Sequence, residues 1–263
     1  MIPKIIHYCW FGKGIIPASY KACIKSWERY MPEYVIKCWD ESNFDVTCND
    51  YVRHAYERKK YAFVSDYARL KALYSEGGFY MDTDIELFKS LDSFGNHQFI
   101  SGIEYFPEFE NYKILLNEEH TPKVSGTIVP YLGFLSAIMG AEVGNKLIFD
   151  TIQFYDSITE GHDDFDGTVI DGIMAREAVK YGFVYRDVEQ QLENKMQLVP
   201  STLFCSMPNQ VTQDSYLLHH CAQSWQPKTK NQQLKIQLDK FHLLKLYKFI
   251  TGMKKQIIKS IKR

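Results

Sequence analysis

Residues 65–84 read SDYARLKALYSEGGFYMDTD, and this stretch decides the fold. Its first half carries apolar residues at steps of three and four, which predicts a helix that the pair Gly77 and Gly78 ends. The apolar run at residues 79–81 then predicts a buried strand that reaches Asp82 within three residues. A helix that leads through a short turn into a buried strand is typical of an α/β fold.

The amino-terminal residues support the same fold class. The run KIIHYCWF at residues 4–11 predicts a buried strand, and residues 17–31 have apolar positions spaced as in a helix. Residues 34–39 predict a second strand, so strand, helix and strand follow each other within about forty residues, the signature of an α/β unit. A longer helix is predicted over residues 51–75, and its inward stripe is formed by Phe63, Tyr67, Leu70 and Tyr74.

The second half of the chain is less regular. Residues 125–160 predict a strand or two and a helix, residues 168–181 a helix, and residues 183–185 a short strand. We therefore expect one α/β domain over residues 1–227, followed by a helical tail over residues 228–263.

The amino-acid composition is typical of a folded protein whose cysteines are reduced. Apolar residues make up 45% of the chain and charged residues 24%, which is ordinary for a globular domain. The six cysteines are scattered, with no C-x-x-C pair, so their spacing argues against a zinc site and favours a reducing compartment. The first residues lack the apolar core of a signal peptide, and no apolar run is long enough to span a membrane. We expect a cytoplasmic protein.

Charge is distributed unevenly between the body and the tail. Residues 228–263 hold eleven Lys and Arg against one acid, Asp239, whereas residues 1–227 hold 20 basic and 31 acidic residues. An acidic body argues against nucleic-acid binding. The sequence predicts that the tail is a basic amphipathic helix. Such a helix either binds the surface of an anionic membrane or packs its apolar face on the domain. A peripheral position on the inner face of the membrane therefore stays open.

The acidic pair Asp82 and Asp84 follows the predicted strand directly. Along a regular strand, residues i and i+2 point to the same side, so both carboxylates can converge on one divalent cation. Hard oxygen ligands suit Mg²⁺ or Mn²⁺, and either ion would bridge them to a diphosphate. A solvated strand end with two chance acids is the simpler alternative for this motif alone.

A second pair of charges lies on the preceding helix. Asp66 and Arg69 are spaced i, i+3, which puts them on one helix face beside the apolar stripe. Charges so close to a buried face need partners. They either form an ion pair that fastens the helix, or they contact a ligand, with Asp66 on sugar or ribose hydroxyls and Arg69 on a phosphate oxygen.

Three segments in order resemble one known family. They are IPKIIHYCWFG at residues 2–12, the stretch at residues 65–84, and HHCAQSW at residues 219–225. Together they resemble the D-x-D sugar-binding glycosyltransferases, which include capsule and lipopolysaccharide sugar transferases, initiating mannosyltransferases and the glucosylating domains of large bacterial toxins. The resemblance implies a GT-A-like domain and retaining transfer of a hexose or N-acetylhexosamine. It also implies a UDP-linked donor and a glycan acceptor, on a lipid carrier, in surface polysaccharide synthesis such as capsule or O-antigen.

The resemblance also implies roles for single residues. Trp10 matches a tryptophan that stacks on the nucleotide base, and Asp66 and Arg69 match a pair that contacts ribose, sugar and phosphate of the donor. Asp82 matches the acid that contacts sugar and ribose, and Asp84 matches the direct ligand of Mn²⁺ or Mg²⁺.

The carboxyl-terminal motif adds three further expectations. His220 falls near a metal-side residue of the family, although the adjacent His219 leaves the choice of histidine open. Ser224 and Trp225 match contacts to the donor diphosphate. The family's acceptor segment is not matched where this chain reads GTVIDG at residues 167–172, so no acceptor contact is implied there.

Two other functions remain open from the sequence. FYMDTDI also fits the opening motif of haloacid-dehalogenase-type phosphatases, in which Asp82 would be the phosphoryl nucleophile and Asp84 the general acid. That interpretation leaves Trp10 and the helix of residues 65–69 unexplained. A nonenzymatic sugar-binding protein is the other alternative, but such a protein would not need a pair of metal ligands.

Overall fold

The computed structural model describes residues 1–159 and 165–222, which form two sheets and the helices around them. The α-helices there are α1 (Ala18–Tyr30), α2 (Asp50–Glu57), α3 (Tyr61–Glu76), α4 (Lys146–Asp156) and α5 (Ile170–Ala178). The strands are β1 (Ile5–Cys9), β2 (Val35–Trp39), β3 (Gly78–Met81), β4 (Ile85–Leu87), β5 (Phe99–Tyr105), β6 (Leu132–Ala141), β7 (Gln190–Leu192), β8 (Met196–Val199), β9 (Phe204–Cys205) and β10 (Leu217–His219). Short 3₁₀ helices are η1 (Asp92–Phe94), η2 (Glu110–Leu115), η3 (Asp166–Thr168), η4 (Val179–Tyr181) and η5 (Pro208–Gln210).

The large sheet has seven strands in the order β2-β1-β3-β6-β5-β8-β7. Strand β1 runs parallel to β2 and β3, whereas β6 is antiparallel to both of its neighbours, β3 and β5. A smaller sheet has the order β4-β10-β9. The predicted α/β class is confirmed, and the sheet is mixed because β6, and β7 at the edge, run opposite to their neighbours.

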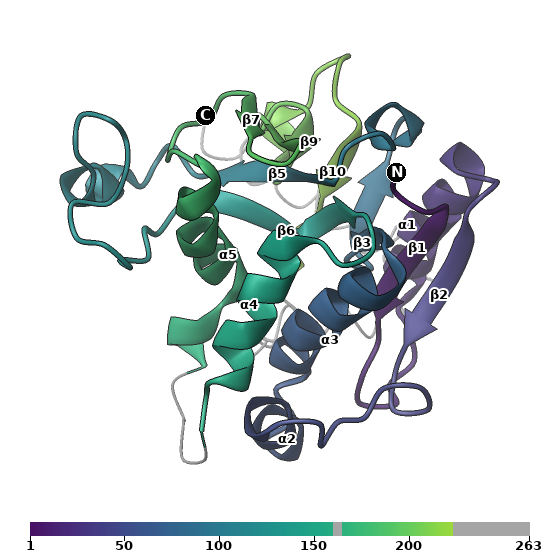
Figure 1. The fold of residues 1–263 in the computed structure, drawn as a ribbon. Helices are drawn as coiled ribbons and strands as arrows, with labels where there is room; N and C mark the ends of the chain where they lie inside the picture. The colour runs from purple at the N-terminus through teal and green to yellow at the C-terminus, as the bar shows by residue number, and fades with distance from the viewer. Residues whose placement is uncertain (160–164, 223–263) are drawn as a thin grey trace, which may run out of the picture.

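Two apolar cores cover the two faces of the large sheet. Helices α3, α4 and α5 lie side by side over one face (Figure 1), where the buried side chains include Tyr80, Phe99 and Phe134. Helix α1 packs on the other face with the small sheet, and its fully buried Trp27 belongs to the same core as Phe79. Adjacent residues of β3 thus point into opposite cores, as the alternation along a strand requires.

The turn from α3 into β3 depends on its two glycines. Gly77 and Gly78 have φ angles of 65° and 99°, in the left-handed region that glycine adopts readily. A Cβ atom on Gly78 would lie 2.6 Å from the carbonyl oxygen of Ile5 in β1. Glycine is therefore needed here both for the backbone conformation and for the close approach of β3 to β1.

Buried His7 fixes the same turn from the side of β1. The indole Nε1 of Trp39 donates to Nδ1 of His7 at 3.0 Å, so the other ring nitrogen carries the hydrogen. That nitrogen, Nε2, lies 2.8 Å from the carbonyl oxygen of Gly77 and donates to it. Burial lowers the pKa of His7, which keeps the ring neutral in the folded protein.

The predicted secondary structure is correct for most of the first half and wrong in three places. The helix expected over residues 51–75 is two helices, because Lys59 adopts a φ of 58° and the chain turns between α2 and α3. Residues 183–185 form no strand. Several strands, among them β5 and the short β10, were not predicted, because their pairing partners are distant in the sequence.

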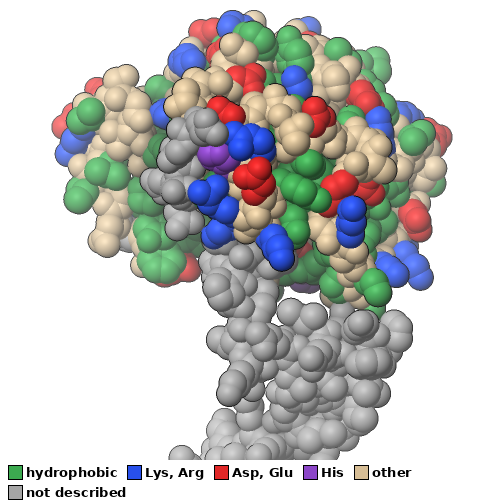
Figure 2. All heavy atoms as spheres, turned by 90° about the horizontal axis from the view of Figure 1, so that it is seen from below, with side chains coloured by type: hydrophobic (Ala, Val, Ile, Leu, Met, Phe, Trp, Pro, Cys, Tyr) green, Lys and Arg blue, Asp and Glu red, His purple; other side chains and the backbone are tan. Residues whose placement is uncertain are grey.

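The outer surface of the described residues is mixed in charge. Figure 2 shows acidic and basic side chains interspersed on the face seen from below the view of Figure 1. Among the described residues, that face has no continuous basic surface of the kind that binds nucleic acids. None of the helices within residues 1–159 and 165–222 has the length and hydrophobicity of a membrane span. The predicted tail, residues 228–263, lies outside the described residues.

The first prediction concerns the pH dependence of stability. The pKa of His7 is lower in the folded state than the value of about 6.5 for an unfolded histidine, so below that pH the unfolded chain binds more protons. The contribution of neutral His7 is therefore complete above about pH 6.5 and is lost as the pH falls. We expect His7→Gln to flatten the decline of the urea midpoint between about pH 6.5 and pH 5. A variant whose midpoint declines as steeply as that of the wild type would contradict this account.

Candidate active site

The two acids of the D-x-D motif lie in a turn between β3 and β4, not on a regular strand. The Asp82 N–H donates to Ala137 O at 2.8 Å, and the Ile85 N–H donates back to Asp82 O at 2.9 Å, which closes the turn. The predicted convergence of Asp82 and Asp84 is therefore produced by a turn rather than by strand alternation. Their carboxylate oxygens and a ring nitrogen of His219 all lie within 4.8 Å of one another.

Strand β10 brings His219 to this turn. It pairs with β4 so that His219 is opposite Ile85, and the Ala222 N–H just beyond it donates to Asp84 Oδ2 at 2.8 Å. His219 Nε2 lies 3.4 Å from Asp84 Oδ1. Burial opposes charge on both groups, but their mutual attraction lowers the pKa of Asp84 and raises the pKa of His219 well above its usual value.

The adjacent histidine points elsewhere. His220 Nε2 lies 2.9 Å from Glu86 Oε2, on the opposite face of the β4–β10 pair from His219. The sequence favoured His220 as the metal-side residue, with the choice between the two histidines open. The geometry favours His219, because neighbouring residues of a strand face opposite sides and only His219 faces the Asp82–Asp84 turn.

Arg69 is the buried hub that holds the D-x-D turn against α3. Its Nη2 lies 3.0 Å from Asp66 Oδ1 and 3.3 Å from Asp82 Oδ1. Nη1 donates to the carbonyl oxygen of Ser136 at 3.0 Å and to its Oγ at 3.4 Å, and Nε donates to Ser65 O at 3.3 Å. Ion pairs and hydrogen bonds to protein groups thus surround the guanidinium, so in this structure Arg69 orients its protein neighbours.

Asp66 and Asp82 are the two acids that Arg69 joins. Asp66 is 7% exposed, and burial raises its pKa to about 7 although Arg69 and the Ile170 N–H oppose the rise. Burial also raises the pKa of Asp82, again against the effect of Arg69. Asp82 Oδ1 accepts a further hydrogen bond from the Tyr80 hydroxyl at 2.6 Å. Tyr80 and Arg69 thus both contact Oδ1 of Asp82. Asp66, by contrast, is buried almost completely.

Trp10 lies at the same edge of the sheet as the acids. Strands β1 and β3 are parallel with Ile6 opposite Phe79, and this register, continued, brings Trp10 level with Thr83. The indole is partly exposed, its Nε1 donates to Gly14 O at 2.7 Å, and its ring meets Tyr20 edge-on. A partly exposed indole at this edge of an α/β sheet, where ligands commonly bind, is compatible with stacking on a base.

A cleft opens next to the acids, and the sequence did not predict its residues. It has a volume of about 360 Å³, and Glu104, Asp171 and Tyr131 are among its lining residues. Asp171 Oδ1 also accepts a hydrogen bond from the Ser136 N–H at 2.9 Å, which links the cleft to the Arg69 hub. Asp171 lies within the GTVIDG segment at residues 167–172, for which no role was predicted. The predicted donor contacts Ser224 and Trp225 lie outside the described residues.

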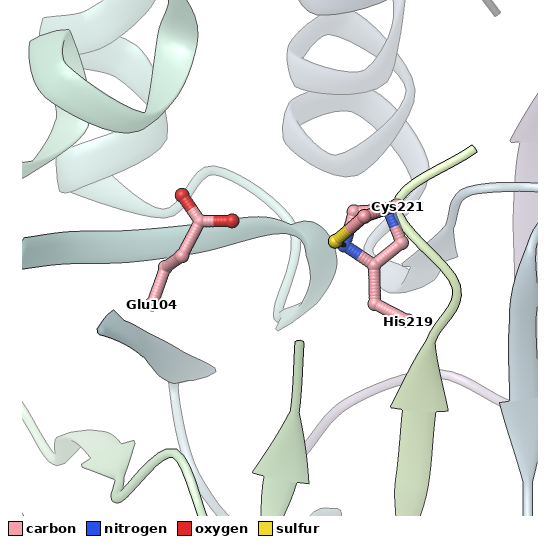
Figure 3. Close-up of side chains that lie close together, drawn as sticks. All are labelled: Glu104, His219 and Cys221. Carbon is pink, nitrogen blue, oxygen red and sulfur yellow. Dashed lines mark hydrogen bonds between the residues drawn. The ribbon is translucent and has the colours of Figure 1, made fainter. Parts of the chain in front are cut away.

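The residues at the turn fit a divalent cation. Asp82 and Asp84 offer carboxylate oxygens and His219 an imidazole nitrogen, all within 4.8 Å of one another. This donor set suits Mn²⁺ or Mg²⁺. Figure 3 shows the second group that includes His219, in which Glu104 faces the histidine and Cys221.

A second prediction tests the Arg69 hub. Arg69→Leu leaves Asp66 and Asp82 without their cation, and removal of one partner from a buried charge pair costs about 3–5 kcal/mol. We expect a loss of that size in the free energy of unfolding, measured by urea denaturation. Arg53→Leu is the matched control, because its ion pairs with Asp50 and Glu57 lie on the surface, and it should cost less than about 1 kcal/mol. Equal losses in the two variants would refute the role of Arg69 as hub.

Several solved glycosyltransferases resemble this structure weakly. The PaToxG glycosyltransferase has a TM-score of 0.48 and 16% identity, over 68% of this chain and 69% of its own. The galactosyltransferase LgtC, in complex with donor and acceptor sugar analogs, has a TM-score of 0.45 and 14% identity, over 82% and 87%. A glycosyltransferase involved in the glycosylation of the major capsid of PBCV-1 has a TM-score of 0.45 and 11% identity, over 89% of this chain and 100% of its own. No curated protein matches the sequence as a relative.

A family model matches the part of the chain that contains the D-x-D turn. Residues 17–100 match the glycosyltransferase sugar-binding region containing the DXD motif. That range includes Asp66, Arg69, Asp82 and Asp84, so the Arg69 hub and both acids of the turn belong to the matched region. The match favours a transferase over the phosphatase and the nonenzymatic binding protein. Residues 17–100 therefore carry the sugar-binding region, with its DXD motif, that is found in glycosyltransferases, and the chain is a glycosyltransferase.

Proposed function

We propose that this protein is a Mn²⁺- or Mg²⁺-dependent, retaining glycosyltransferase of the GT-A type. It moves a hexose or N-acetylhexosamine from a UDP-linked donor to a glycan acceptor. The observation that carries the proposal is the convergence of Asp82 and Asp84, both within the matched sugar-binding region, with His219 from β10. The UDP donor and retention rest on the family resemblance, and the metal rests on the donor set.

The donor side of the site is organised by residues with separate tasks. Asp84 and His219 would hold the cation, which when bound neutralises the charge that develops on the diphosphate leaving group. The Ala222 N–H and the β4–β10 pairing keep Asp84 and His219 in place without the donor. A site prepared in this way need not reorganise during the reaction, which is how polar groups stabilise a transition state most effectively.

Asp82 presents one carboxylate oxygen to the ligand. Its Oδ1 is held by the Tyr80 hydroxyl and by Arg69, so the orientation of the carboxylate is fixed, and Oδ2 would be the oxygen that meets the donor sugar or the cation. In this scheme Asp66 and Arg69 are positioning residues. Their predicted contacts with ribose and phosphate would be indirect, because both side chains are at least nine-tenths buried beneath Asp82.

The acceptor would enter the cleft that contains Glu104, Asp171 and Tyr131. Carboxylates accept hydrogen bonds from sugar hydroxyls, and aromatic rings pack on the apolar faces of sugar rings. Tyr131 is 44% exposed and stacks on Phe109, with 4.5 Å between ring centroids, which supplies a rigid aromatic surface at the cleft. The cleft is next to the metal group, since Glu104 and His219 have ligand atoms within 4.8 Å of each other.

The biological setting follows from the resemblance and from the tail. A lipid-linked glycan acceptor in capsule or O-antigen synthesis would be found at the inner face of a membrane. The basic residues of the tail, residues 228–263, would attach the enzyme to that anionic surface. Because the tail lies outside the described residues, this part of the proposal rests on sequence alone.

The third prediction tests the metal-dependent reaction on the donor. With Mn²⁺ and a panel of nucleotide sugars, we expect slow release of nucleoside diphosphate and free sugar, abolished by EDTA and restored by Mn²⁺. Asp84→Asn keeps the size of the side chain but removes the charge, so it should abolish the reaction. His219→Asn should raise the Mn²⁺ concentration for half-maximal rate at least about tenfold, whereas the control His220→Asn should leave it unchanged. Undiminished activity of Asp84→Asn or of the EDTA-treated enzyme would exclude the proposed metal site.

The fourth prediction concerns the acceptor cleft. Tyr131→Ala removes the exposed aromatic surface and should raise the KM for the acceptor about tenfold, the cost of roughly 1.4 kcal/mol of lost contact. Hydrolysis of the donor in the absence of acceptor should be unchanged. Phe149→Ala is a matched control, because its ring is 39% exposed and packs on Tyr74, away from the residues that line the cleft. Equal acceptor KM values for Tyr131→Ala and the wild type would place the acceptor elsewhere.

A further inference from the structure

A second group of metal-ligating side chains lies beside the D-x-D turn. Glu104 at the end of β5, His219 at the end of β10 and Cys221 just beyond have their ligand atoms within 4.8 Å of one another. Figure 3 shows the Glu104 carboxylate on one side of a gap and the Cys221 thiol beside the His219 ring on the other. Each of the three residues is only partly buried, so an ion can reach them from solvent.

The sulfur and nitrogen are already spaced as ligands of one ion. Cys221 Sγ lies 3.4 Å from His219 Nδ1. A tetrahedral zinc with bonds of about 2.3 Å to sulfur and 2.0–2.1 Å to nitrogen requires a separation of about 3.6 Å. The two side chains need almost no movement to bind, and rotation of the longer Glu104 side chain would bring its carboxylate to the third position. The thiol otherwise donates to Ser206 O at 3.2 Å, a bond that metal binding would replace.

The backbone at Cys221 is held in an uncommon conformation. Its φ is 45°, in the left-handed region, which costs energy for a residue with a side chain. The surroundings maintain this conformation through the next residue, because the Ala222 N–H is bound to Asp84 Oδ2 at 2.8 Å. The same turn therefore secures Asp84 and aims the thiol at the ring of His219.

We propose that Glu104, His219 and Cys221 form a binding site for Zn²⁺, with a fourth position open to water. A thiolate, an imidazole and a carboxylate form a donor set that suits zinc, whereas Mn²⁺ and Mg²⁺ prefer oxygen ligands such as Asp82 and Asp84. The cysteine spacing in the sequence argued against zinc. It could not indicate this site, because Glu104 is distant in the sequence from His219 and Cys221 and is brought close to them only by the fold.

The two metal groups share His219, which makes them mutually exclusive. Zinc would take Nδ1, and the hydrogen on Nε2 would then be directed at Asp84 Oδ1, 3.4 Å away, as metal-bound histidines commonly donate to a carboxylate. A histidine held in this way cannot offer Nε2 to Mn²⁺. Zinc at this site therefore inhibits the transferase. Binding of zinc is independent of the proposed function, whereas inhibition rests on it.

Binding is tested with cobalt, which replaces zinc and reports its ligands. The full-length protein titrated with Co²⁺ should develop the near-ultraviolet thiolate-to-cobalt absorption, and Zn²⁺ should displace it. Cys221→Ser should abolish this absorption, and Glu104→Gln should weaken zinc binding at least about tenfold in competition with a chelator. Cys48→Ser, a cysteine on the surface and outside the cluster, is the matched control and should retain the absorption. No thiolate absorption in the wild type, or absorption that survives Cys221→Ser, would overturn the zinc site.

Inhibition is tested separately on the donor reaction. At saturating Mn²⁺, added Zn²⁺ should suppress donor hydrolysis by the wild type at least about tenfold, and Cys221→Ser should keep its basal rate and resist zinc. Equal inhibition of both proteins would overturn the regulatory role. Absence of hydrolysis in the Mn²⁺-loaded wild type would instead count against the proposed function, and the cobalt experiment would still decide the zinc site.

Discussion

The buried guanidinium of Arg69 is the interaction on which the rest of the site depends. It joins Asp66 on the same helix, Asp82 in the turn after β3, and Ser136 in the neighbouring strand β6. A buried cation requires such a set of acceptors, and each acceptor is fixed in return. Helix α3, strand β6 and the turn that presents the acids are therefore one unit, and the position of Asp82 follows from the packing of the core.

Two long-range features complete the site around that unit. The parallel pairing of β1 with β3 puts Trp10 at the edge of the sheet that carries Asp82 and Asp84. The antiparallel pairing of β10 with β4 adds His219 from the far end of the described chain. Ligands of open α/β sheets bind at this edge, where the side chains of several strand ends meet. His219 is the residue with two possible partners, because its Nε2 faces Asp84 and its Nδ1 faces Cys221. In our proposal, the enzyme is active when His219 binds the catalytic cation through Nε2 and inhibited when it binds zinc through Nδ1.

The sequence predicted the parts of the molecule whose causes are local. The apolar spacing before Gly77, the glycine pair and the following strand are read within one short stretch, and the structure has each of them. The break between α2 and α3 escaped prediction because a single positive φ at Lys59 interrupts an otherwise continuous apolar spacing. The choice of His219 over His220 also escaped it, since the direction of each side chain is set by the pairing of β10 with β4. Glu104 and Asp171 had no motif at all, and only the folded chain brings them to the cleft.

Anomalous diffraction can test whether Asp84 and His219 hold the catalytic cation. Crystals grown with Mn²⁺ and UDP, measured at a wavelength where manganese scatters anomalously, would locate the ion. We expect an anomalous peak within bonding distance of an Asp84 carboxylate oxygen and of His219 Nε2, with the diphosphate on the open side of the ion. A peak that lies at His220 and Glu86 instead, or an ion bound without Asp84, would contradict it.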